Sequence, residues 1–267
     1  MRESFFNEQI RQYFEEDKLA EAAAYCAELL PEIRAAHGEM HSEVARVLAD
    51  MARAYYYLGD YPAALKASKQ LAKIDCELSD EVSAEYICHL SNFALHYRLT
   101  GHIPEAELAY DRALELIEFL PLGDEWDRAI TLIGRAQVHE IKREFGQAER
   151  LLQEAVRIRA RSEGWCSPGL AIVFDNLAGL YRRMGKSVAA ERAIRKAIRM
   201  YRNTADTESV YYAGSLRLLA RLLAEQSNIS EAKALANEAL AILRRICVPS
   251  HPDTKIVEHL VDELKKR

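Results

Sequence analysis

Two short strings in this 267-residue chain come close to motifs that carry chemistry. The string HEIKR at 139–143 opens like HExxH, which holds zinc between two histidines one helical turn apart, but Arg143 replaces the second histidine. The string GKS at 185–187 resembles the end of a phosphate-binding P-loop, but Leu180 stands where the first glycine is required. We therefore expect no metal site, no bound cofactor and no enzymatic activity.

The other reactive side chains are scattered along the chain. The eight histidines form no spaced cluster, and no Ser/His/Asp arrangement can be argued from their positions. The cysteines are odd in number and include no CxxC pair with metal-ligand spacing, so we predict reduced thiols in a cytoplasmic protein. They are Cys26, Cys76, Cys88, Cys166 and Cys247.

The charge and hydropathy of the chain exclude two classes of partner. A net charge of −5 and a sequence pI near 6.0 give the whole molecule no basic field that would attract nucleic acid or an anionic membrane. No apolar stretch approaches the length of a bilayer-spanning helix. We expect neither a nucleic acid nor a membrane as partner.

A strict internal repeat of 42 residues runs along the chain. Alanine recurs every 42 residues without insertion or deletion, and a second alanine ladder lies twelve residues upstream, with Ile10 in place of its first member. Where two helices cross closely, a side chain larger than methyl would force their axes apart, so these positions predict helix crossings. The first ladder is Ala22, Ala64, Ala106, Ala148, Ala190 and Ala232, and the second is Ala52, Ala94, Ala136, Ala178 and Ala220.

Each repeat is predicted to be two amphipathic helices joined by a tight turn. Apolar residues recur at helical spacing on both sides of the turn. The turn position lies five residues before the ladder alanine and is glycine in three repeats, which suits the positive φ that ends a helix. Its six residues are Asp17, Gly59, Gly101, Arg143, Gly185 and Ser227. Plausible N-caps of the first helices are Ser42, Asp80, Asp124, Ser167 and Thr207.

These residues carry a resemblance to a known family. The strings LAGLYRRMGKSVAAERAIRKAI at 177–198 and FALHYRLTGHIPEAELAYDRAL at 93–114 resemble the tetratricopeptide repeat. The 42-residue period, DNLAGLY and the HPDT at 251–254 are similar to the long repeats of kinesin light chains. HEAT and armadillo repeats have a similar length but lack this arrangement of Gly and Ala. Repeats one, four and five depart from the pattern at Asp17, Arg143 and Ser187, so these units are candidates for distortion or for capping.

The resemblance implies an all-α fold, a right-handed superhelical α-solenoid of six helix-turn-helix repeats plus a C-terminal capping helix. We predict one solenoid domain over residues 1–267. Its repeats are expected at about 2–37, 42–78, 80–120, 124–162, 168–204 and 207–247, with the capping helix at about 252–266.

The resemblance also implies that the first helix of each repeat lines a concave groove. Carried over residue by residue, the groove positions hold eight arginines and four acidic residues, so the groove is locally basic within an acidic molecule. Arginine can bind carboxylates in pairs, and tyrosine offers contact area at low entropic cost. The candidate partner-binding residues are Arg11, Arg46, Arg53, Tyr56, Tyr57, Asn92, Arg98, Asn176, Arg182, Arg183, Arg217 and Arg221.

We therefore expect a non-catalytic adaptor or scaffold that holds an acidic peptide segment of another protein in this groove. Two alternatives stay open. The arginines could be solvated or paired with neighbouring acids, and the chain could be a regulator that changes conformation or assembly when it senses a small ligand or signalling peptide. Weak self-association through solenoid ends or convex faces also stays open.

Overall fold

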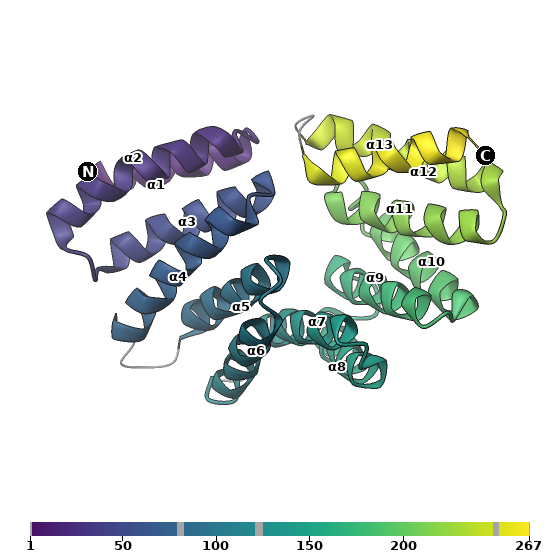
Figure 1. Ribbon diagram of the computed structural model, residues 1–267, viewed down its shortest axis with the longest axis horizontal. Helices are drawn as coiled ribbons and strands as arrows, with labels where there is room; N and C mark the ends of the chain where they lie inside the picture. The colour runs from purple at the N-terminus through teal and green to yellow at the C-terminus, as the bar shows by residue number, and fades with distance from the viewer. Residues whose placement is uncertain (1, 79–82, 121–124, 248–250, 267) are drawn as a thin grey trace. The chain divides into compact units, whose positions relative to one another are not determined.

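The computed structural model describes residues 2–78, 83–120, 125–247 and 251–266, and the side chains from residue 8 onward within these ranges. The described residues form thirteen helices and no strand. Contacts between Cα atoms divide the chain into two compact units, Met1–Asp127 and Arg128–Arg267. Each unit is a stack of helix pairs, coloured purple to teal in the first and teal to yellow in the second (Figure 1).

The helices of the first unit pack in sequence, each against the next along the chain. They are α1 (Arg2–Glu15), α2 (Leu19–His37), α3 (Ser42–Leu58), α4 (Tyr61–Leu78), α5 (Ala84–Leu99) and α6 (Ile103–Ile117). The core between α1 and α4 includes Leu48 and Cys26, both fully buried. Burial of these apolar side chains holds successive pairs together.

The second unit continues the same pattern and ends in a single helix. Its helices are α7 (Glu125–Ile141), which begins in the first unit, α8 (Phe145–Glu163), α9 (Pro168–Arg183), α10 (Ser187–Asn203), α11 (Val210–Glu225), α12 (Ile229–Ile246) and α13 (Pro252–Lys265). Helix α11 contacts both α9 and α13, so these helices form one layer of the stack. This helical architecture of stacked repeats confirms the predicted fold class.

The helices recur with the same 42-residue spacing as the ladder alanines. All six second helices begin three residues before the ladder alanine, from Leu19 of α2 to Ile229 of α12. Every alanine of the first ladder is at most 1% exposed, and the second ladder is at most 4% exposed. The ladders are thus buried between the helices, which is what a position at a helix crossing requires.

All six turn positions adopt a positive φ, whether or not they are glycine. In each turn the N–H after this residue donates to the carbonyl five residues back, as Glu144 does to His139 at 2.8 Å, and the turn residue donates three residues back. This pair of hydrogen bonds is the Schellman motif that ends a helix. Arg143 has φ +62° within an otherwise regular repeat, so repeat four is not distorted by its missing glycine.

The predicted helix starts are partly right. Ser167 caps α9 by accepting from the N–H of Leu170 at 3.1 Å, and Pro168 and Pro252 begin α9 and α13. The prediction that Ser42 is the N-cap of α3 was wrong by one residue. Nδ1 of His41 accepts from the N–H of Glu43, so His41 is the N-cap and Ser42 is the first helical residue.

Repeat six begins later than predicted. The N-cap of α11 is Ser209 and not Thr207, because the Ser209 hydroxyl accepts from the N–H of Tyr212 at 3.2 Å. Asp80 and Asp124 lie outside the described residues. In the described part of the chain, no helix is both long enough and apolar enough to cross a membrane. A single solenoid domain stays a prediction.

Candidate partner-binding surface

In the first unit, the predicted arginines are paired within their own repeats. Arg11 lies between two carboxylates of α1, 3.8 Å from Glu8 and 3.6 Å from Glu15. Arg46 forms an ion pair with Glu43 one turn earlier on α3. Each of these contacts joins two residues of one helix, so these charges are compensated locally.

Arg53 and Arg98 are also engaged by their neighbours. Arg53 donates to Asp50 at 2.7 Å, and its guanidinium lies over the ring of Phe14, 3.7 Å from the centroid. Arg98 lies beside the hydroxyl of Tyr110, which is buried. The sequence analysis left open that the predicted arginines are paired with neighbouring groups. In the first unit, the contacts are those that this alternative expects.

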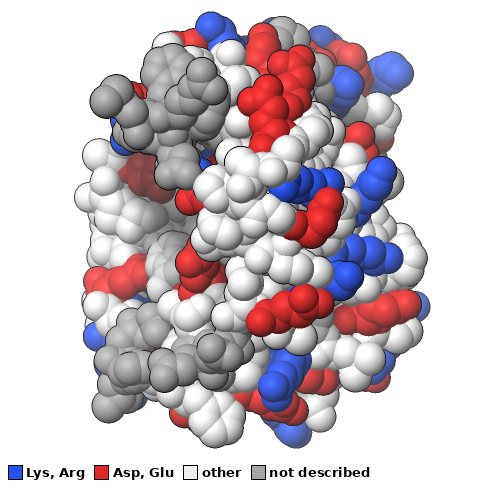
Figure 2. Space-filling model, turned by 90° about the vertical axis from the view of Figure 1, so that its left-hand side faces the viewer, with Lys and Arg blue, Asp and Glu red and all other residues white. Residues whose placement is uncertain are grey.

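The polar and aromatic candidates of the first unit are spread over α3 and α5. The rings of Tyr56 and Tyr57 meet edge to face with centroids 5.3 Å apart, and Tyr57 is 41% exposed. Asn92 is exposed and its amide donates to the sulfur of Cys88. On the side of the molecule where α1 to α4 lie in Figure 1, basic and acidic side chains are interspersed (Figure 2).

In the second unit, part of the predicted set is joined by contacts between repeats. Asn176 of α9 accepts from the Gln137 amide of α7 at 2.7 Å. Arg183 pairs with Glu140 at 3.0 Å, and Arg182 pairs with Glu225 of α11 at 3.2 Å. First helices of successive repeats are thus joined through residues at predicted groove positions.

Arg217 and Arg221 of α11 differ from the other candidates. Within the described part of the chain, neither forms a hydrogen bond or an ion pair, although both are half-buried. Burial and the nearby charges of Arg221 and Arg182 lower the pKa of Arg217, while Asp253 and Asp175 act in the opposite direction. We call Arg182, Arg217 and Arg221 the arginine cluster.

Sequence reasoning missed Asp253 as a neighbour of the cluster. It stands in the first turn of α13, the capping helix, and its charge reaches Arg217. The HPDT string that contains it was visible, but only the packing of α13 on α11 shows which groove residue it faces. Three carboxylates therefore act on the three arginines of the cluster, Glu225 on Arg182 and both Asp253 and Asp175 on Arg217.

A half-buried carboxylate on α9 contacts both α10 and α11. Asp175 of α9 accepts from the Ser215 hydroxyl at 2.7 Å through Oδ1 and from the Tyr201 hydroxyl at 3.0 Å through Oδ2. Both donors are at most 1% exposed. Burial raises the pKa of Asp175 to about 7, although the two hydrogen bonds and the charge of Arg217 act to lower it.

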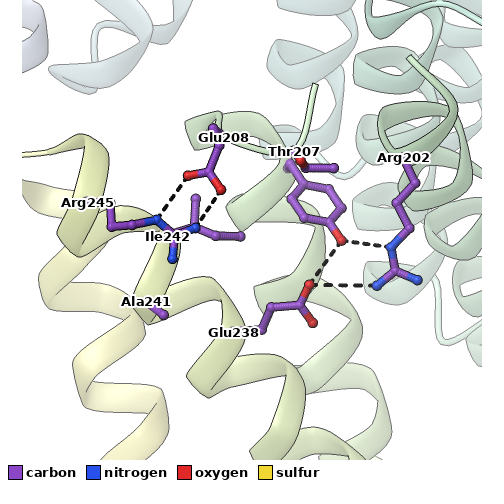
Figure 3. Close-up of a pocket in the computed structure, with 8 residues that line it drawn as sticks. Arg202, Thr207, Glu208, Glu238, Ala241, Ile242 and Arg245 are labelled. Carbon is purple, nitrogen blue, oxygen red and sulfur yellow. Dashed lines mark hydrogen bonds and ion pairs between the residues drawn. The ribbon is translucent and has the colours of Figure 1, made fainter. Parts of the chain in front are cut away.

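The second unit also has a small pocket between α10, α11 and α12. It has a volume of about 300 Å³, and Arg202, Glu208, Glu238 and Arg245 are among its lining residues (Figure 3). Arg245 forms an ion pair with Glu208 at 2.5 Å, and Tyr212 accepts from Arg202 and donates to Glu238. The charges of the pocket are thus satisfied by one another. No group of His, Cys, Asp or Glu in the described residues could hold a metal ion.

Comparison with known proteins agrees with the repeat geometry. A model of the tetratricopeptide repeat family matches residues 85–161 and 169–245, more than half of the chain. The chain belongs to the tetratricopeptide repeat family. Among curated tetratricopeptide relatives, KINESIN LIGHT CHAIN-RELATED 3 of Arabidopsis thaliana is 30% identical over 226 residues, which are 82% of this chain and 34% of that protein. The chain spans about a third of the length of the curated relatives it matches.

Solved structures share the tetratricopeptide fold at lower identity. BtubC (BKLC) from P. vanneervenii is 19% identical with a TM-score of 0.66, over 85% of this chain and 92% of that chain. NprR, solved in complex with its cognate peptide NprX, is 12% identical with a TM-score of 0.74, over 98% of this chain and 72% of that chain. These likenesses and the kinesin light chain relatives confirm the predicted resemblance. Tetratricopeptide proteins are generally non-catalytic scaffolds for protein–protein interaction.

Proposed function

We propose that this chain is a non-catalytic adaptor whose arginine cluster binds an acidic peptide segment of another protein. The carrying observation is that Arg217 and Arg221 have no ion-pair partner in the described chain, while five of the other predicted arginines do. Half-buried positive charges that repel one another gain most from an anion supplied from outside. A carboxylate of a peptide is such an anion.

The contacts between repeats support this assignment. Arg182 stands on α9 and the other two arginines on α11, and these helices contact each other. The Arg182–Glu225 pair joins the two helices, which orients one arginine before any ligand arrives. A site held by packed helices loses less freedom on binding than a site on loops.

The probe for the test is an acetylated and amidated hexaglutamate, labelled for fluorescence anisotropy. We expect the double variant Arg217→Gln with Arg221→Gln to weaken binding at least tenfold. A matched control, Arg157→Gln with Arg199→Gln, removes the same charge from exposed positions on α8 and α10 and should change affinity less than threefold. Equal losses in both double variants would show that only net charge matters, and the proposal would fail.

We also propose a cytoplasmic location and protein rather than nucleic acid or membrane as partner. The five cysteines are all free, which supports a reducing compartment. Pull-down with the wild type and both double variants, read by mass spectrometry, tests the partner. A protein retained by the control and lost from the Arg217/Arg221 variant is the expected result.

The pocket between α10, α11 and α12 favours a second candidate function, a regulator that senses a small ligand or a signalling peptide. In NprR the same fold accommodates a cognate peptide. A ligand that binds only the folded state raises thermal stability, so a stabilising small-molecule fraction would favour this candidate. An Ala241→Trp substitution, which fills the pocket from α12, should abolish that stabilisation and leave hexaglutamate binding unchanged.

A further inference from the structure

We propose that two copies of this chain associate through opposite charges, the first unit of one copy binding the second unit of the other. The inference goes beyond the proposed function and does not use the arginine cluster. Residues 1–127 hold 11 Lys and Arg against 25 Asp and Glu, whereas residues 128–267 hold 25 against 16. With histidines neutral, the first unit has a formal net charge of −14 and the second of +9, although the whole chain has only −5.

Part of the positive charge of the second unit lies on the exposed sides of α8 and α10. Four exposed arginines stand there in two pairs, and the second pair follows the first by one 42-residue repeat. None of the four forms a hydrogen bond or an ion pair within the described part of the chain. An uncompensated positive surface attracts a negatively charged one. We call these residues the basic face: Arg150, Arg157, Arg192 and Arg199.

The carboxylates of α8 and α10 are directed to residues outside the basic face. Each of the four glutamates on these helices has an ion pair or a hydrogen bond with another side chain. The partners are Tyr181 for Glu149, Arg128 for Glu154, Arg159 for Glu163 and Arg195 for Glu191. The basic face is therefore not neutralised by its own helices.

The first unit has an acidic face on α2. Its members are Glu21, Glu28 and Glu32, which are exposed and form no hydrogen bond or ion pair within the described residues. Arg34 is the one arginine or lysine of α2, and it pairs with Glu39 at 3.0 Å. Residues seven and eleven positions apart lie on the same side of a helix, so the three carboxylates form one stripe.

The two faces match in spacing as well as in sign. Positions 150, 157 and 161 of α8 are all arginine, with the same separations of seven and four residues that the acidic face has on α2. Eleven residues span about 16.5 Å along a helix. Two such helices that lie side by side in the same direction can bring three guanidinium groups to three carboxylates.

A second copy fits these charges better than a nucleic acid does. A nucleic acid would use only the basic face, and the negative charge of the first unit would repel its phosphates. A second copy supplies an acidic face for each basic face and is present at the same concentration. Because one exposed ion pair contributes little and is screened by salt, we expect the association to be weak and to require low ionic strength.

Sedimentation equilibrium of the full chain measures the association. At about 20 mM NaCl the average mass should exceed the 30.3 kDa of one chain and rise with protein concentration, and at about 500 mM it should return to that value. Arg150→Glu with Arg157→Glu should weaken the association about tenfold or more. The matched control, Lys255→Glu with Lys266→Glu, makes the same charge change at exposed positions of α13 and its C-cap and should weaken it less than about threefold. Equal losses in the two variants would overturn the inference.

A mixture of two charge-reversed variants tests the pairing of the faces and shows that both variants are folded. Glu28→Arg with Glu32→Arg reverses the acidic face and should also give the mass of one chain at low salt. An equimolar mixture with the Arg150→Glu, Arg157→Glu variant should recover the association, because each reversed face then meets one of opposite sign. A mixture that keeps the mass of one chain would overturn the inference.

The inference and the proposed function fail separately. Arg217→Gln with Arg221→Gln should lose hexaglutamate binding and keep the self-association, while Arg157→Gln with Arg199→Gln should do the opposite. A wild type that has the mass of one chain at both salt concentrations overturns the inference and leaves the proposed function standing. If it also binds a labelled DNA duplex at about 150 mM salt, the basic face belongs to a nucleic-acid site.

Discussion

Oγ of Ser68 on α4 lies 2.8 Å from Nδ1 of His96 on α5, in the interior of the first unit. Both residues are at most 3% exposed. Burial lowers the pKa of His96 to about 4, so the ring is neutral at pH 7. The contact joins repeats two and three through a group that acid can charge.

We predict that acid destabilises the first unit through His96. Because the unfolded chain takes up the proton near pH 6.5 and the folded chain only near pH 4, stability is lost as pH falls between these values. Because of this residue, the free energy of unfolding measured with urea should be about 2 kcal/mol lower at pH 5 than at pH 7. His96→Gln should lose most of this difference, and the exposed His102→Gln should retain it. The same acid sensitivity in His96→Gln would contradict the assignment.

Arg143→Gly is predicted to stabilise the protein. Arg143 holds φ +62° at the turn of repeat four, where a side chain costs about 1 kcal/mol that glycine avoids. Part of this gain is offset by the greater freedom of glycine in the unfolded chain, so a net stabilisation of about 0.5 kcal/mol is expected in urea unfolding.

The reverse change at the equivalent turn provides the control. Gly185 holds φ +72°, and Gly185→Ala should destabilise by about 0.5 kcal/mol, with the same two contributions in reverse, although open space surrounds the added methyl. A destabilised Arg143→Gly variant would mean that the arginine side chain, and not its backbone, stabilises the turn.

The alanine ladder should reject larger side chains. Ala22 on α2 is fully buried, so Ala22→Leu is expected to destabilise by about 2 kcal/mol or more. Ala24 lies on the exposed side of the same helix, and Ala24→Leu should change stability by less than about 0.5 kcal/mol. Thermal unfolding followed by circular dichroism distinguishes them. Similar melting temperatures for the two variants would show that the site of Ala22 can accommodate a larger side chain, which would contradict the prediction.

We predict that the second unit becomes less stable as pH rises, because of Asp175. Its carboxyl stays protonated to about pH 7 in the folded chain but ionises near pH 3.8 in the unfolded chain, so stability falls between these values. The loss between pH 5 and pH 8 should be about 2.6 kcal/mol, measured by urea unfolding. Asp175→Asn should remove that loss. A variant with the wild-type pH dependence would show that another group titrates.

Several features of the fold followed from residue spacing alone. All six turn positions were predicted, because helix periodicity and helix ends depend on residues within a few positions of one another. Local sequence was not sufficient to identify the N-cap residue at every helix start. His41 caps α3 in place of Ser42, and Ser209 caps α11 in place of Thr207, because more than one polar side chain near each helix start can accept from the first free N–H groups.

The sequence by itself determined the repeat, its 42-residue phase, the buried alanines and the set of candidate arginines. Only the tertiary structure decided which of those arginines are compensated, because a guanidinium pairs with whatever carboxylate lies within a few ångströms of it in space. Arg182 finds Glu225 on another repeat, while Arg217 and Arg221 have no such partner in the described chain. The enclosure of Asp175 by Tyr201 and Ser215 likewise needs three packed helices, and no spacing within one repeat encodes it.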